Sequence, residues 1–243
     1  MPAVLLLGAS SDMSTAIARK FAQDKFDIIL AGRNTEQLSA LKTDLEIRYK
    51  IRAEIAEFDA LNYSTHFSFY KNLPINPDVT ICVFGYLGDQ KKAEVNWQEA
   101  ERIIATNYVG AISILNIIAE DYDEKKHGFI VGISSVAGER GRQSNYLYGS
   151  AKAGFTAYLS GLRNRLYKNG VHVVTVLPGF VYTKMTADIK LPAMLTATPE
   201  QVAEAIKKAV KNKTNIIYVK WFWRWIMFII KCVPESIFKK MKL

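Results

Sequence analysis

The sequence contains very few of the residues that build disulfide frameworks and metal centres. Its 243 residues include two cysteines, Cys82 and Cys232, and three histidines, His66, His127 and His172. Two cysteines so far apart exclude a disulfide scaffold and a thiolate metal site. The scattered histidines argue against a histidine-built metal centre, so we expect no metal ligands.

A recognisable targeting signal is also missing. The chain begins MPAVLLLGASSD, without the basic flank of a secretory signal peptide, and its apolar run ends after a few residues. We therefore expect a cytoplasmic protein. The composition, 49% hydrophobic and 23% charged residues, excludes disorder, collagen-like repeats and a coiled coil.

Acidic residues are nearly absent from the last part of the chain. From Lys207 onward, Glu235 is the only acid against ten basic residues, so this segment carries the whole net charge of +9 and residues 1–206 are neutral. The charge pattern indicates a balanced domain followed by a cationic tail.

Short apolar runs alternate with helical segments along most of the chain. Capping-box patterns indicate helix starts at Asn34 and Thr198. The alternation predicts the α/β class, with a single doubly wound parallel sheet of the Rossmann type and helices on both faces. Ligands of such sheets bind at the carboxyl ends of the strands. The predicted strands cover residues 3–7, 26–30, 51–58, 79–84, 128–133, 171–177 and 216–219.

The first predicted strand leads into a tight turn of small residues, and a helix follows from about Thr15. Backbone N–H groups and the positive dipole end of such a helix suit an anion such as a pyrophosphate, although a turn that only caps the helix has the same pattern. Asp12 fits if its carboxylate is turned away to cap the helix. The candidate cofactor-binding residues here are Gly8, Ser10, Ser11, Asp12 and Met13.

The next two strand ends carry residues suited to other parts of a dinucleotide. Arg33 and Asn34 follow the second strand, where an acid would accept hydrogen bonds from a ribose diol and an arginine instead pairs with a 2′-phosphate. We therefore expect NADP(H) as the preferred cofactor; NAD(H) binding, with Arg33 as a solvated surface residue, is the alternative. Asp59 and Ala60 end the third strand, and the carboxylate can accept a hydrogen bond from an adenine amino group.

Three stretches in the middle of the chain indicate proton-transfer chemistry. Tyr148 and Lys152 are spaced to lie on one face of a helix. A nearby ammonium favours the phenolate, so we expect the pKa of Tyr148 to fall from about 10 towards neutrality and make a general acid or base. Ser135, at a neighbouring strand end, can hydrogen-bond the same substrate oxygen. Asn107, in the preceding helix, would hold a water behind the lysine.

These motifs resemble the short-chain dehydrogenase/reductase family over residues 3–219. The resemblance rests on GASS after the first strand, ISSVAG, YGSAK and LPGFVYT. It implies an oxidoreductase that forms a homodimer or homotetramer. By the same resemblance, the catalytic tetrad is Ser135, Tyr148, Lys152 and Asn107, with Tyr148 and Lys152 also touching the cofactor, and the residues bordering the nicotinamide are Pro178, Gly179, Val181 and Thr183.

Two departures from the family pattern concern cofactor geometry and selectivity. Asp12 and Ser14 replace two glycines of the family's turn, and Val83-Phe84-Gly85-Tyr86 stands where the family has Asn-Asn-Ala-Gly; Gly85 stays a candidate cofactor contact. The Phe-Gly-x-Leu-Gly-Asp run, the acid in the turn and the carboxyl-terminal layout resemble one branch of the family. That branch contains the reductase of decaprenylphosphoryl-2-keto-pentose (an erythro-pentofuranosid-2-ulose), which acts in making the arabinose donor for cell-envelope polymers.

The tail is aromatic and basic. Wound as a helix, Lys220, Arg224 and Lys231 fall within about 40° of each other and the rest of the run is apolar. Pro234 breaks this helix, which is too short to span a bilayer, since a span needs about 20 apolar residues. The pattern predicts a helix lying in the headgroup region of an anionic membrane. Packing on its own domain or in a dimer interface is the alternative, and nucleic-acid binding is disfavoured.

Together these observations predict a dinucleotide-binding catalytic domain at residues 1–219 and an amphipathic tail at residues 220–243. The expected activity is NAD(P)H-dependent reduction of a ketone, and the resemblance suggests a keto-sugar on a polyprenyl phosphate, met at the inner face of the membrane. One alternative is a reductase of 3-ketoacyl or 3-keto-sphingoid lipids. An alternative of another class is a non-catalytic dinucleotide sensor.

Overall fold

The computed structural model describes residues 1–186 and 192–241, and a seven-stranded parallel sheet lies at their centre. The strand order is β3-β2-β1-β4-β5-β6-β9, and every neighbouring pair is parallel. This confirms the predicted doubly wound fold. The strands are β1 (Ala3–Leu7), β2 (Asp27–Gly32), β3 (Ala53–Glu57), β4 (Val79–Cys82), β5 (Gly128–Ile133), β6 (Val171–Pro178) and β9 (Ile216–Val219), with β7 (Phe180–Val181) and β8 (Thr196–Ala197) forming a separate pair.

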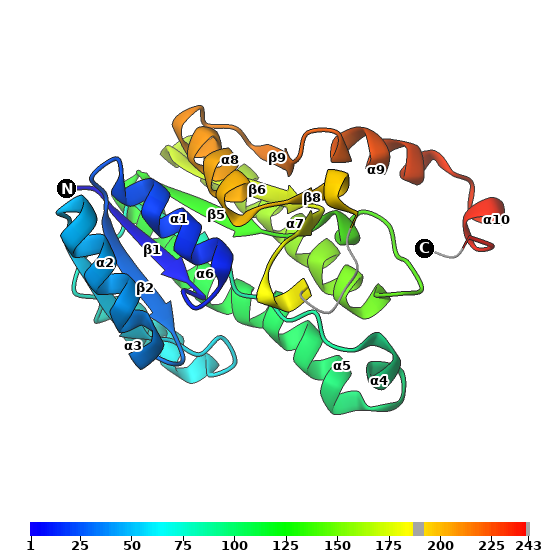
Figure 1. Cartoon of the computed structure of the whole chain (residues 1–243), viewed down its shortest axis with the longest axis horizontal. Coiled ribbons are helices and arrows are strands. Elements are labelled where there is room, and N and C mark those ends of the chain that lie inside the picture. Colours follow the sequence, from blue (N-terminus) through cyan, green and yellow to red (C-terminus); the bar gives the residue numbers. More distant parts are fainter. Residues whose placement is uncertain (187–191, 242–243) are drawn as a thin grey trace.

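Helices cover both faces of the sheet (Figure 1). Alternate residues of the buried strands point to opposite faces, so Val4 and Leu6 join a core with α1, α2 and α8, while Leu5 and Leu7 join one with α3, α6 and α7. The helices are α1 (Asp12–Ala22), α2 (Ser39–Tyr49), α3 (His66–Lys71), α4 (Gln90–Val95), α5 (Trp97–Ile104), α6 (Gly110–Lys125), α7 (Tyr146–Leu166), α8 (Pro199–Lys211), α9 (Trp223–Cys232) and α10 (Glu235–Phe238).

The two predicted capping boxes have different outcomes. At Thr198 the box is complete, with reciprocal hydrogen bonds between Thr198 and Gln201. At Asn34 the prediction of a helix start is confirmed only in part: helical structure begins at Glu36 as a 3₁₀ turn over Glu36–Leu38, and α2 itself begins at Ser39. The Asn34 carboxamide accepts one long hydrogen bond, 3.5 Å, from the backbone N–H of Gln37.

One helical stretch, Trp97–Lys125, joins α5 and α6 through a π-helical turn, Ala105–Val109. Within the described residues it is the stretch long and apolar enough to cross a membrane by length and composition. Its α6 part packs against the sheet and buries Ile114, Leu115 and Ile118, as core helices of this composition do.

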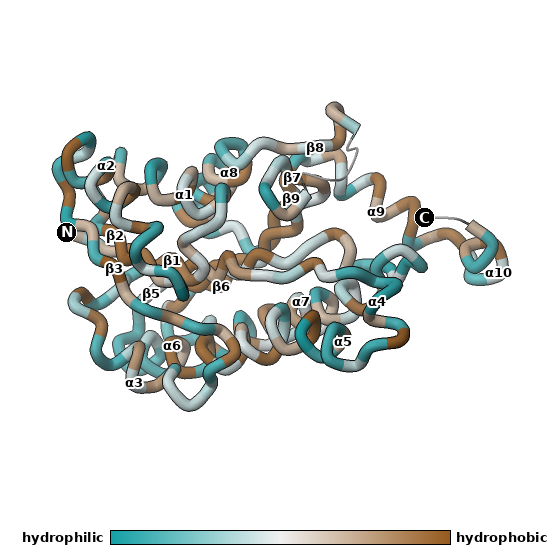
Figure 2. The backbone as a smooth tube through the Cα atoms, turned by 60° about the horizontal axis from the view of Figure 1, so that its bottom comes forward, coloured by the Kyte–Doolittle hydropathy of each residue, from teal (hydrophilic) through white to brown (hydrophobic). Residues whose placement is uncertain are grey.

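The tail forms α9 and α10 and extends beyond the edge of the sheet (Figures 1 and 2). One face of α9 packs on the domain through Trp223 and Met227, which are buried against Val136 and Leu177. Ion pairs of 2.7 Å join Lys231 to Glu139 and Arg140 to Glu235.

The prediction that Lys220 belongs to the helix is wrong. Lys220 has a φ of 50° and precedes α9, and its ammonium donates to the Met194 carbonyl. Of the predicted basic stripe, only Arg224 and Lys231 lie on the helix itself. At the end of the tail, Lys242 and Leu243 lie outside the described residues.

Candidate active site

The carboxyl ends of β1 and β4 meet where the strand order reverses, and this is where sheets of this type bind ligands. Gly8, directly after β1, has a φ of 94°, a conformation that side chains rarely adopt. A Cβ there would lie 2.7 Å from the backbone nitrogen of Phe84, which follows β4. Glycine is therefore required at this position by both the turn and the neighbouring strand end.

The turn after Gly8 is closed by hydroxyls instead of additional glycines. Ser11 caps α1 by accepting from the backbone N–H of Ser14 at 3.0 Å, and the buried Ser14 hydroxyl donates to the Gly8 carbonyl at 2.8 Å. Asp12 is the first residue of α1, and its carboxylate accepts from the backbone N–H of Lys184 at 2.9 Å. The cap is thus Ser11, not Asp12, and the carboxylate ties the turn to the loop after β7.

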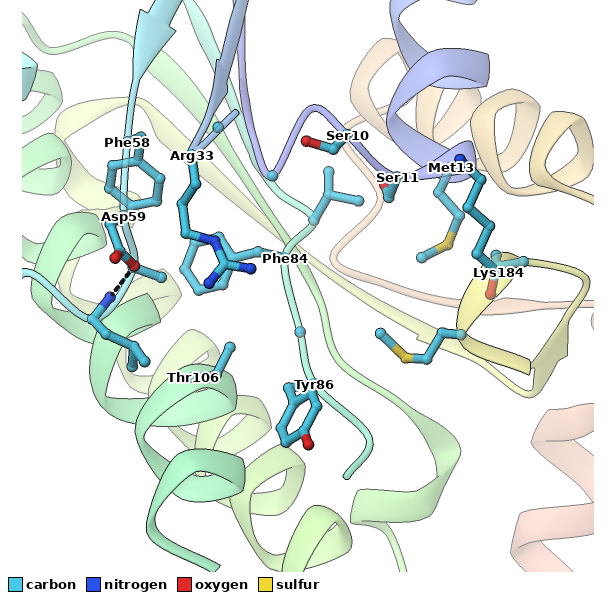
Figure 3. A pocket seen from close by; sticks show the side chains of 18 of the residues that line it. Ser10, Ser11, Met13, Arg33, Phe58, Asp59, Phe84, Tyr86, Thr106 and Lys184 are labelled. Carbon is cyan, nitrogen blue, oxygen red and sulfur yellow. Dashed lines mark hydrogen bonds between the residues drawn. The ribbon is translucent and has the colours of Figure 1, made fainter. Parts of the chain in front are cut away.

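A cavity of about 330 Å³ begins at this turn and runs along the ends of β2, β3 and β4 (Figure 3). Arg33 and Asp59 lie on one side of it and Ser10, Ser11 and Met13 on the other. Ten of the predicted cofactor-binding residues line it: Gly8, Ser10, Ser11, Asp12, Met13, Arg33, Asp59, Ala60, Gly85 and Thr183. Asn34 does not line this cavity or the one beside it.

A second cavity, about 390 Å³, adjoins the first, since Met13, Val83, Gly85, Thr183 and Met185 line both. It lies over the ends of β5 and β6. The predicted catalytic and nicotinamide-bordering residues on its wall are Ser135, Tyr148, Lys152, Pro178, Gly179, Val181 and Thr183. Strand ends and the first turns of α7 therefore bring together residues that are far apart in the sequence.

The prediction that Lys152 lowers the pKa of Tyr148 is wrong for this structure. The Lys152 ammonium lies 5.7 Å from the centre of the Tyr148 ring and donates to the Ile133 carbonyl at 3.0 Å. Burial raises the pKa of Tyr148 to about 12, although a hydrogen bond with Ser135 opposes this rise. Burial also lowers the pKa of Lys152 to about 8. For both groups, the free-energy cost of removing the charged form from water is larger than the attraction between a phenolate and an ammonium this far apart.

Asn107 is buried in the π-helical turn and makes three hydrogen bonds. Its side-chain amide donates to the carbonyls of Tyr86 at 2.6 Å and Ile103 at 2.8 Å, and its oxygen accepts from the backbone N–H of Tyr86 at 3.2 Å. Both N–H donors are therefore engaged. The side chain holds the segment after β4 against the helix, next to Gly85 and Lys152, since a Cβ on Gly85 would lie 2.9 Å from the Asn107 oxygen and 3.5 Å from the Lys152 ammonium.

Several lining residues escaped sequence reasoning. Phe58 and Tyr86 form walls of the first cavity, and Arg142, Asn145 and Trp223 form walls of the second. Phe58 directly precedes Asp59 at a strand end, and this position could have drawn attention to it. Tyr86 lies in the stretch that replaces the family's Asn-Asn-Ala-Gly and Trp223 lies in the aromatic tail, but neither pattern indicates a cavity wall. Arg142 and Asn145 belong to no motif, and only the folded chain brings them to the site.

Comparison with known proteins agrees with this geometry. The sequence profile described as "short chain dehydrogenase" matches residues 2–193. An uncharacterized oxidoreductase of Mycobacterium tuberculosis is 34% identical, with 98% of this chain and 96% of that protein covered. The ketoacyl reductase HetN of Nostoc is 30% identical, with 89% and 77% covered. The chain belongs to the short-chain dehydrogenase family of oxidoreductases.

Among solved structures, a short-chain dehydrogenase from Sphingobium yanoikuyae in complex with NADPH superposes with a TM-score of 0.82. It is 20% identical and the match covers 97% of this chain and 98% of that one. A likeness at this level of identity supports the fold.

Proposed function

We propose that this oxidoreductase reduces a ketone with a nicotinamide dinucleotide that lies across the two cavities. The observation that carries the proposal is the convergence of Ser135, Tyr148 and Lys152 on a cavity continuous with the glycine turn. The residues fit such a cofactor, because the turn leaves Gly8 without a side chain and presents the N-terminus of α1 to a pyrophosphate. When bound, the cofactor supplies the hydride.

The residues around the substrate carbonyl have separate roles in this proposal. Tyr148 stays protonated at neutral pH because burial raises its pKa to about 12, and it donates its proton to the carbonyl oxygen. Ser135 hydrogen-bonds the same oxygen. Lys152 stabilises the phenolate as it forms and hydrogen-bonds the cofactor ribose. Asn107 holds the segment after β4 in place and positions a relay water. An intact set of these groups favours an enzyme over a non-catalytic sensor.

The preferred cofactor in this proposal is NADP(H), because Arg33 points into the first cavity where a 2′-phosphate would lie (Figure 3). Replacing Arg33 by alanine should weaken NADPH binding about 10- to 100-fold, since a charge-assisted hydrogen bond to a phosphate is lost. NADH binding should change less than about threefold. Dissociation constants from cofactor fluorescence measure both, and equal weakening of the two would assign Arg33 a structural role instead.

For the substrate we propose a keto-sugar on a polyprenyl phosphate, in line with the branch that the Phe-Gly-x-Leu-Gly-Asp run resembles. The second candidate is a 3-ketoacyl or 3-keto-sphingoid lipid, supported by the likeness to the ketoacyl reductase HetN. Both are lipid ketones. The two candidates are distinguished by measuring NADPH oxidation by the purified protein with a short-chain prenyl-phosphoryl 2-keto-pentose and with a 3-ketoacyl thioester. If the protein turned over neither ketone, the substrate proposal would be overturned.

We further propose that residues 1–219 are the catalytic domain and that the tail rests on the cytoplasmic face of the membrane. The outer face of α9 exposes a stripe of apolar side chains, Trp225, Phe228 and Ile229, with Trp221 just before the helix. Arg224 lies beside this stripe, and Lys239 and Lys240 follow at the end of the tail. Aromatic side chains flanked by cations suit an interface of anionic lipid. A homodimer or homotetramer is the expected assembly.

Substituting the three stripe residues by serine should weaken binding to phosphatidylglycerol vesicles at least tenfold, because about 1.5 to 3 kcal/mol of burial is lost at each apolar side chain. Cosedimentation measures it. Ile47 on α2 and Phe67 on α3 are similarly exposed, and serine there serves as the control. The membrane proposal would be contradicted if the serine variant bound vesicles as well as the wild type, or if it lost its oligomeric state and kept its vesicle binding. Deleting the whole tail is a poorer test, since it also removes the buried Trp223 and Met227.

A further inference from the structure

Two polar side chains in the second cavity have buried atoms without partners. Within residues 1–186 and 192–241, the Arg142 Nε and the Asn145 Oδ1 are buried and form no hydrogen bond. Buried polar atoms of this kind are rare and each calls for an explanation. Arg142 and Asn145 both line the cavity that contains Tyr148.

The arginine closest in sequence is engaged elsewhere, which sets Arg142 apart. Arg140, two residues before Arg142, pairs with Glu235 at 2.7 Å. Arg142 forms no ion pair with a described carboxylate, and burial alone lowers its pKa. The Arg142 side chain is half-buried, and its buried Nε without a hydrogen-bond partner is costly unless a ligand supplies an acceptor.

Backbone hydrogen bonds fix the turn that carries these two side chains. Asn145 donates its backbone N–H to the Arg142 carbonyl at 3.1 Å, and its own carbonyl accepts from Gly149 at 2.8 Å. This turn leads directly into α7, which carries Tyr148 three residues later. A donor and an acceptor are therefore presented from a hydrogen-bonded turn beside the proposed proton donor.

The two side chains lie at the substrate end of the site, not at the cofactor phosphates. The turn residues Ser10 and Ser11 and the arginine placed for the 2′-phosphate, Arg33, line the first cavity and not the second. The wall of the second cavity also contains Phe180 and Trp223, whose rings meet edge to face at 5.6 Å. The ligand there meets a cation, an amide and aromatic carbon.

We propose that Arg142 and Asn145 form a subsite that binds an anionic, hydroxylated part of the ketone substrate, a phosphoryl group being the anion. The inference rests on the proposed ketone reduction and adds the residues that recognise the anionic part of its substrate. The guanidinium binds the phosphoryl oxygens, and the amide oxygen of Asn145 accepts from a neighbouring hydroxyl. A ketose phosphate or a glycosyl phosphodiester has both groups, whereas a simple ketone has neither.

The test compares D-ribulose 5-phosphate with D-ribulose as ketones in NADPH oxidation, together with a farnesyl-phosphoryl 2-keto-pentose as the lipid-linked form. Replacing Arg142 by glutamine should lower kcat/KM for the phosphorylated ketones about 10- to 100-fold and that for ribulose less than threefold. Asn145→Ala should lower kcat/KM for both D-ribulose 5-phosphate and D-ribulose. Turnover of the lipid-linked form alone identifies a headgroup as the anion's source, and turnover of ribulose 5-phosphate identifies a free sugar phosphate.

Two controls make the result specific. Arg165, at the far end of α7, pairs with Glu120, and R165Q should leave the ratio of the two kcat/KM values unchanged. Asp188 lies outside the described residues, and D188N should leave that ratio unchanged as well. Equal losses for charged and neutral ketones in R142Q, or the same selectivity change in D188N, would overturn the subsite.

A binding measurement separates failure of the subsite from failure of the proposed function. Phenyl phosphate is titrated into the NADP⁺-loaded protein by ligand-observed NMR, so that the 2′-phosphate site is already filled. Saturable binding that R142Q abolishes supports the subsite even when no ketone is turned over, a result that would overturn only ketone reduction. Equal binding to both proteins would overturn the subsite.

Discussion

Replacing Tyr148 by phenylalanine is expected to lower kcat for ketone reduction about 10²- to 10⁴-fold, the range that a positioned general acid contributes. The change removes one oxygen and leaves the ring, which packs against the cluster of Ala93, Ala100 and Ile103. Cofactor binding and thermal stability should stay nearly unchanged. Steady-state NADPH oxidation with any accepted ketone, together with the NADPH dissociation constant, measures both expectations.

The matched control is Tyr146→Phe. Tyr146 lies two residues earlier on α7, is exposed and does not line the cavity, so kcat should change less than about threefold because surface substitutions rarely disturb a site. Full activity of Y148F would remove the tyrosine from the reaction. A similar loss in Y146F would show that hydroxyls on this helix act through the fold.

The pH profile of the wild type provides a second readout of the same assignment. Burial raises the pKa of Tyr148 to about 12, so the proton donor is fully protonated at neutral pH and does not limit reduction there. Burial lowers the pKa of Lys152 to about 8, so its ammonium is lost as pH rises through that value. Reduction should therefore be constant below about pH 7 and fall above about pH 8, and Lys152→Met should abolish this inflection.

Most of the fold follows from local patterns. Three of the seven predicted strands, those at residues 3–7, 128–133 and 216–219, have the observed bounds, because each is a short apolar run bounded by turn residues on both sides. The parallel arrangement follows from the alternation of strands with helices. The edge strand β3 starts two residues later than predicted, since Ile51 is buried against the sheet without pairing in it.

The site divides into a predictable and an unpredictable part for a physical reason. Residues within two positions of a strand end, such as Gly8 and Ser135, can be placed from the sequence, because the carboxyl ends of parallel strands meet on one side of the sheet. The direction of the Tyr148 pKa shift could not be predicted from the sequence. The helical spacing predicts that Lys152 lies near the ring, but it does not predict the burial, which raises the pKa more than the ammonium lowers it. Arg142 reaches the cavity from a loop without a motif.

The tail was the least predictable element, because a helix that is apolar on most sides does not reveal which face is covered. The structure buries Trp223 and Met227 and exposes Trp225 and Phe228 on the same helix. Packing on the domain and an exposed apolar face thus coexist. Trp223 also reaches the cavity wall, so the tail and the site are physically connected.

Replacing Trp223 by alanine is expected to destabilise the docked tail by about 3 to 5 kcal/mol, the usual cost of truncating a buried tryptophan. Trp223 is 4% exposed, donates through Nε1 to the Leu195 carbonyl at 3.1 Å and packs against Phe180. Hydrogen exchange of α9 and the denaturation midpoint measure the loss. Trp225→Ala, two residues along and 58% exposed, is the control and should cost less than about 0.5 kcal/mol.

The same side chain explains why position 179 is a glycine, and a double-mutant cycle tests this. A Cβ on Gly179 would lie 2.0 Å from the Trp223 ring, so Gly179→Ala alone should overpack the site at a cost of about 1 to 3 kcal/mol. In the Trp223→Ala background the methyl group enters the space that the indole leaves, and most of that cost should disappear. Equal costs in both backgrounds would show that something other than the Trp223 indole requires glycine at this position, and that the tail does not shape the cavity.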